Sequence, residues 1–226
     1  MALESQKTAD ARFDTARLTT LIASGVVLMG SGAVAVIGGD DELDIIVGLG
    51  ACIACVMAAT GVGRRASLIG TRSLARVSLI VVGVSSLLLT PMVIVLSAMM
   101  MTVAFATGAM GPTGLLVLQW SGVAAAGGLV LLCALFAAVD LGRSGRIPSP
   151  WGWLALPALT LGVVGSSIKA GIGAAAAMAW MSPYTGLYRV ITAFQSIGAV
   201  GFGALMVALG GVLGVVSLGT RTSPFR

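Results

Sequence analysis

The stretch VSLIVVGVSSLLLTPMVIVLSAMMMTVAFA, residues 77–106, contains no charged side chain, and it is one of six apolar stretches that decide the fold. The other five cover residues 18–37, 44–62, 113–139, 151–180 and 190–218. A helix of about 20 apolar residues crosses the hydrocarbon core of a bilayer, and the alternating pattern of a membrane β-barrel is absent. We therefore expect an all-α integral membrane protein: a single bundle of six transmembrane helices over residues 18–219, with short tails at 1–17 and 220–226.

The composition supports a membrane location. Hydrophobic residues make up 58% of the 226 residues and charged residues 9%, whereas a soluble domain carries roughly a quarter charged residues. The apolar surface must then face lipid or other helices, and no second domain is expected. The net charge of +5 does not indicate nucleic-acid binding, because most basic residues lie in the gaps between apolar stretches.

The charges of the gaps alternate along the chain. The first gap is acidic, with Asp40, Asp41, Glu42 and Asp44. Basic residues concentrate in the tails and in the second and fourth gaps: Lys7, Arg12, Arg17, Arg64, Arg65, Arg72, Arg76, Arg143, Arg146, Arg221 and Arg226. The positive-inside rule places such segments on the cytoplasmic side, so both termini are predicted to be cytoplasmic. The richness in glycine and alanine favours a bacterial or archaeal plasma membrane.

Lys169 is a lone charge inside the fifth stretch. It precedes Trp180 by about 11 residues, which corresponds to a depth of about 16 Å at a rise of 1.5 Å per residue. The lysine stem is too short to bring its ammonium to the head groups from that depth. Gly165 and Gly173 lie four residues away on either side, so this face is expected to pack against other helices. An ionisable group inside a membrane is a candidate functional group.

Two glutamines lie at a similar depth to Lys169. We predict a polar cluster in the outer half of the bundle that contains Lys169, Gln119, Gln195, Ser166 and Ser196. The cluster would serve as an anion or substrate contact, as a proton-linked switch, or as a tie to a carboxylate on a partner chain. A structural lysine bonded to backbone carbonyls or water is the alternative interpretation.

Several kinds of site are excluded or disfavoured. The chain has no histidine, which excludes histidine-held haem and the usual histidine metal sites. Cys52 and Cys55 have the CxxC spacing, but both lie in an apolar stretch, where cysteines usually act as small hydrophobes. The acidic first gap is too short to supply the six to eight oxygens of a calcium site alone; it is expected to be a solvated outer loop or a docking surface. We predict no cofactor, no metal and no enzyme activity, with a thiol oxidoreductase as the alternative.

The shortage of polar groups in the spans favours a non-catalytic structural or assembly subunit of a larger membrane complex, whose partners would be lipid and other membrane subunits or further copies of the chain. The alternative is a small-solute or ion transporter or channel that uses the polar cluster around Lys169. Pro91, in the middle of the third stretch, predicts a kink there. A solvent-accessible cavity that reaches Lys169 would favour transport, and a dry, sealed Lys169 would favour the subunit.

Overall fold

Helices form every element of the described chain. The computed structural model describes residues 2–38, 44–62, 67–69, 73–108, 111–144, 147, 151–177 and 185–219. The elements are α1 (Ala2–Gly38), α2 (Asp44–Thr60), α3 (Ser73–Thr107), α4 (Pro112–Arg143), the short 3-10 helix η2 (Trp151–Leu154), α5 (Ala155–Ala177) and α6 (Thr185–Gly219). The first helix begins well before the apolar stretch, because the preceding polar segment is rich in alanine, glutamate, glutamine and other good helix formers.

The lengths and compositions of the helices indicate a multi-pass membrane protein. Within the described residues, five segments are long and apolar enough to cross a membrane: Thr15–Gly38, Leu74–Ala104, Thr113–Arg143, Trp151–Gly173 and Gly186–Val215. The apolar part of α2, Ile45–Thr60, is shorter than these. Large apolar side chains cover the outside of the bundle; Leu132 and Val117, for example, are each 67% exposed. A hydrocarbon solvent accounts for such a surface, and water does not.

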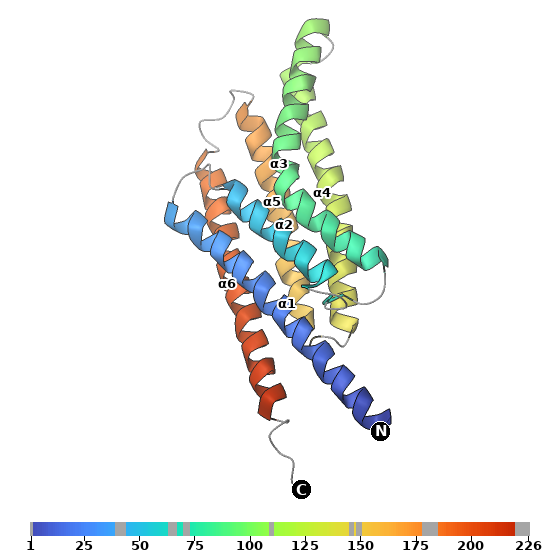
Figure 1. Ribbon diagram of the computed structural model, residues 1–226. Coiled ribbons are helices and arrows are strands. Elements are labelled where there is room, and N and C mark those ends of the chain that lie inside the picture. The colour runs from blue at the N-terminus through green and yellow to red at the C-terminus, as the bar shows by residue number, and fades with distance from the viewer. Residues whose placement is uncertain are drawn as a thin grey trace.

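The six α-helices form a closed ring of contacts. Each helix packs on the next in the chain, α6 packs along α1, and two further contacts join α2 to α6 and α3 to α5. The contacts of the first three helices recur in the last three. α1–α2 corresponds to α4–α5, α2–α3 to α5–α6, α1–α6 to α3–α4, and α2–α6 to α3–α5. Corresponding helices, such as α1 and α4, run in opposite directions (Figure 1). The order of the contacts is therefore compatible with two inverted halves, α1–α3 and α4–α6, but the extent of corresponding contacts differs: α2–α3 is extensive and α5–α6 is loose.

Glycines bring α1 and α6 close together over a long stretch. A Cβ atom on Gly203 would lie 2.5 Å from the backbone nitrogen of Met29 and 2.6 Å from the carbonyl oxygen of Gly25. A Cβ on Gly32 would lie 2.6 Å from the carbonyl oxygen of Ser196. Small residues at such positions let helix backbones approach closely in lipid, where dispersion contacts drive association. This pair is the most extensive helix contact in the bundle.

The segment after α2 folds back and caps the end of that helix. Gly61 has a φ of 83°, which favours glycine and stops the helix. The backbone N–H of Val62 then donates to Thr20 Oγ1 of α1 at 2.9 Å, and Ser67 Oγ donates to the carbonyl oxygen of Ala59 at 2.7 Å. Leu68 and Ile69 follow, both buried in the main apolar core between the two halves.

Two further features concern the course of the chain. α3 changes direction along its length (Figure 1), and Pro91, which lacks the N–H for a helical hydrogen bond, lies near its middle. The start of α1 and the last turn of α6 lie at the same end of the bundle (Figure 1).

Candidate functional site

The two faces of α5 have different surroundings. One face packs on α4: a Cβ on Gly127 would collide with the Ser167 hydroxyl, and a Cβ on Gly171 would lie 2.5 Å from the Trp120 ring. Ser167 and Gly171 are four residues apart, so they lie on the same side of the helix. Glycine on both helices thus fixes how α5 is rotated. The rotation turns Ser166 and Lys169 away from α4.

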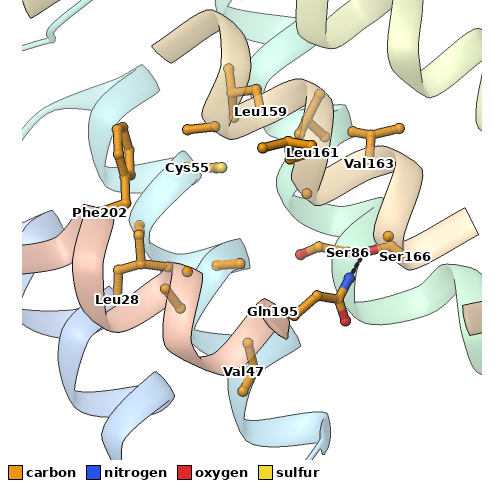
Figure 2. A pocket seen from close by; sticks show the side chains of 18 of the residues that line it. Leu28, Val47, Cys55, Ser86, Leu159, Leu161, Val163, Ser166, Gln195 and Phe202 are labelled. Carbon is orange, nitrogen blue, oxygen red and sulfur yellow. Dashed lines mark hydrogen bonds between the residues drawn. The ribbon is translucent and has the colours of Figure 1, made fainter. Parts of the chain in front are cut away.

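Ser166 and Lys169 instead line a large cavity. Its volume is about 1100 Å³, and residues of all six α-helices line it. This volume is slightly above the 300–1,000 Å³ typical of ligand pockets. Figure 2 shows Leu28, Val47, Gln195 and Phe202 on one side of the cavity and Leu159, Leu161, Val163 and Ser166 on the other. The cavity therefore lies between α5 on one side and α1, α2 and α6 on the other.

The cavity is apolar over most of its wall and polar in one region. The lining residues with polar side chains are Ser85, Ser86, Thr90, Ser166, Lys169, Tyr188 and Gln195. Among the described residues that line it, Lys169 alone carries a charge. Lys169 is 7% exposed, so its ammonium is withdrawn from the outer surface of the protein.

Two side-chain pairs build the polar region. Lys169 Nζ lies 5.2 Å from the centroid of the Tyr188 ring, within the range of a cation–π interaction. Gln195 Nε2 donates a hydrogen bond to Ser166 Oγ at 3.1 Å, drawn as a dashed line in Figure 2. Gly165 makes room for this bond, because a Cβ there would lie 2.9 Å from Gln195 Nε2. Both pairs link α5 to α6, whose mutual contact is otherwise loose.

Two of the residues predicted to join the cluster point elsewhere. Gln119 is buried and donates from Nε2 to the carbonyl oxygen of Gly171 at 3.1 Å, on the α4 side of α5, and its Oε1 has no hydrogen-bond partner. Ser196 is also buried and donates to the Thr192 carbonyl oxygen at 2.9 Å within α6. The structure thus places Lys169, Ser166 and Gln195 along one cavity and places Gln119 and Ser196 at helix interfaces.

Tyr188 is a site residue that is absent from the predicted polar cluster, although it lines the cavity beside Lys169. The available signal was its spacing: Tyr188, Gln195 and Phe202 are seven residues apart on α6, so they lie on one face of that helix. All three line the cavity. Counting seven residues in either direction from Gln195 would have identified this face of α6.

The described site presents mainly hydrogen-bond donors. Its ammonium, amide and hydroxyl groups donate hydrogen bonds, and no described lining residue is a carboxylate or histidine. No group of three or more His, Cys, Asp or Glu in the described chain could hold a metal ion. Cys52 and Cys55 are free, and Cys55 lines the cavity. In the predicted acidic loop, Asp40, Asp41 and Glu42 lie outside the described residues, and Asp44 is the first residue of α2.

Comparison of the chain with known proteins found no matching family model, no matching curated protein and no matching solved structure.

Proposed function

We propose that this protein is a small membrane transporter that binds its solute in the cavity beside Lys169. The observation that carries the proposal is the cavity itself, about 1100 Å³ in volume and in contact with the buried ammonium. A lysine with a purely structural role would not require a cavity of this size beside its ammonium group. The proposed orientation has both chain ends in the cytoplasm of a bacterial or archaeal cell, as the positive-inside rule suggests.

The helix arrangement supports the same function. Many transporters consist of inverted halves, bind substrate near the bilayer midplane where the halves meet, and rock one half against the other. Here the helices contact one another in the same order in the two halves, and helices of both halves line the cavity. The α5–α6 contact, within the second half, is loose, which would let these two helices move relative to each other around the cavity.

The competing proposal is a structural or assembly subunit. Exposed glycines such as Gly122 and Gly128 on α4, where an added Cβ would meet nothing within 4 Å, offer a smooth face to a partner helix or a second copy. This function requires no solute path to Lys169.

Thiol labelling from the aqueous phase tests the choice. Cys52, Cys55 and Cys133 are replaced by alanine, and a single cysteine is introduced by Ser166→Cys in the cavity or by Ser121→Cys on the exposed side of α4, which does not line the cavity. Proteoliposomes are treated with a charged, membrane-impermeant methanethiosulfonate. A transporter predicts labelling at position 166 from at least one side and much slower labelling at position 121.

Two results would decide against transport. The first is the absence of labelling at position 166 from either side of the membrane together with the absence of solute binding by the purified wild-type chain. The second is purification from mild detergent with other membrane proteins in fixed stoichiometry, together with a protected position 166. That combination is the behaviour of an assembly subunit.

A further inference from the structure

We infer that the solute is a single-chain amphiphile with an anionic head group, which reaches the cavity sideways from the bilayer between α5 and α6. The inference rests on the proposed function for its premise that the cavity holds a solute, and it specifies the class of that solute and its route.

The distribution of polarity along the cavity matches a head and a tail. Lys169, Ser166 and Gln195 mark the polar region, whereas Leu159, ten residues before Lys169 on α5, marks a part of the wall where the neighbours are apolar. Ten residues of helix correspond to about 15 Å. A ligand that satisfies both regions has a charged group at one end and a hydrocarbon chain of that length.

The expected negative charge of the ligand's head group follows from the positive charge of the residues that line the cavity. Lys169 is the charged group among the described lining residues, and an ammonium binds a carboxylate or phosphate through short, charge-assisted hydrogen bonds. The Ser166 hydroxyl accepts its bond from Gln195 and so keeps a proton to donate. An anionic oxygen beside Lys169 can accept from both side chains.

The cavity is open on the side where α5 faces α6. Phe194, Leu161 and Ile197 line the cavity and are nevertheless 77%, 71% and 62% exposed. Gly162 and Gly198 also line it, and a Cβ on either would meet nothing within 4 Å. An opening with this apolar rim, on helices that cross the membrane, admits hydrocarbon chains more readily than hydrated ions.

Binding of a fluorescent fatty acid tests the role of the head group. The purified chain in nanodiscs is titrated with cis-parinaric acid and, separately, with its uncharged methyl ester, for wild type, Lys169→Met and Lys169→Arg. Loss of a charge-assisted bond lowers affinity by about tenfold or more. Lys169→Met should therefore weaken binding of the acid about tenfold and leave the ester within twofold, whereas Lys169→Arg should retain most of the affinity for the acid.

A matched pair of glycine variants tests the route. Gly198→Phe places a ring at the cavity opening, whereas Gly201→Phe places one on the same helix at an equally open position that does not line the cavity. Gly198→Phe should weaken both the acid and the ester at least tenfold, and Gly201→Phe should change neither. Equal effects of the two glycine variants, or of Lys169→Met on acid and ester, would overturn the inference.

The proposed function can survive that failure. If a cysteine at position 166 is labelled from water and acetate protects it as well as parinaric acid does, the cavity serves a small water-borne anion and the amphiphile is excluded. If position 166 is never labelled and neither probe binds, both proposals fail.

Discussion

Replacing Gly203 with alanine should destabilise the protein, although alanine is the better helix former. The added Cβ would lie 2.5 Å from the Met29 backbone nitrogen and 2.6 Å from the Gly25 carbonyl oxygen. Ordinary contacts are near 3.5–4.0 Å, so α1 and α6 must separate by roughly 1 Å. Overpacking of this kind costs about 2 kcal/mol, and the gain in helix propensity returns about 0.7 kcal/mol. The expected net loss is about 1.3 kcal/mol.

Gly201 supplies the control for this prediction. It lies two residues away on the same helix, and a Cβ there would meet nothing within 4 Å. Gly201→Ala should therefore stabilise the protein by about 0.7 kcal/mol, since it changes helix propensity alone. The two variants should differ by about 2 kcal/mol, which is roughly a 30-fold difference in the unfolding equilibrium.

Reversible unfolding in mixed micelles of neutral detergent and dodecyl sulfate, followed by tryptophan fluorescence, measures this difference. Opposite signs for the two variants are expected. If Gly203→Ala is as stable as Gly201→Ala, the close approach of α1 and α6 is wrong, and with it the packing described for this side of the bundle.

Three further predictions concern single polar groups and the topology. Thr20→Val should cost about 0.5–1.5 kcal/mol in the same unfolding assay, because it leaves the Val62 N–H without its 2.9 Å partner in a partly buried place, while Thr19→Val on the exposed side of α1 should change stability by less than about 0.5 kcal/mol. Gln119→Leu should leave the free energy of unfolding nearly unchanged, because it removes the hydrogen bond to Gly171 and also a buried amide oxygen that has no partner. A loss of stability above about 2 kcal/mol would contradict this account of the amide oxygen. Reporter proteins fused to either end should both report the cytoplasm, and opposite locations for the two ends would contradict an even number of crossings.

The helices themselves could be read from the sequence. Runs such as 77–106 exceed the length of a membrane crossing and contain no charge, and the helical segments of the structure follow them. The glycines beside Lys169 also allowed a correct prediction that this side of α5 faces other helices. A Cβ on Gly165 would lie against Gln195 of α6, and a Cβ on Gly173 would lie nearest to atoms of Ile94, Thr90 and Tyr188. In both cases the deciding property, length or residue size, is local to one stretch.

The membership of the polar cluster needed information that the sequence lacks. Position along a span gives the depth of a residue, but its direction around the helix axis comes from comparing one face with another, and these helices are apolar on all sides. Gln195 and Ser196 have the same depth, yet Gln195 reaches the cavity and Ser196 lies where α6 meets Gly32 of α1. The cavity could not be predicted from the sequence either, because it depends on the distance between helices that are far apart in the chain.

The size of the cavity itself constrains what it contains. The cavity has a volume of about 1100 Å³ and is open along the side where Phe194 and Leu161 are exposed, so in a membrane it is in contact with its surroundings and is filled by them. Water is a poor filler, because each buried molecule needs two to four polar partners and most of this wall is apolar. Hydrocarbon is the remaining filler, and the membrane provides it at high concentration beside the exposed rim of Phe194 and Leu161. On the proposed route, the hydrocarbon chains beside this rim would enter the space next to Lys169.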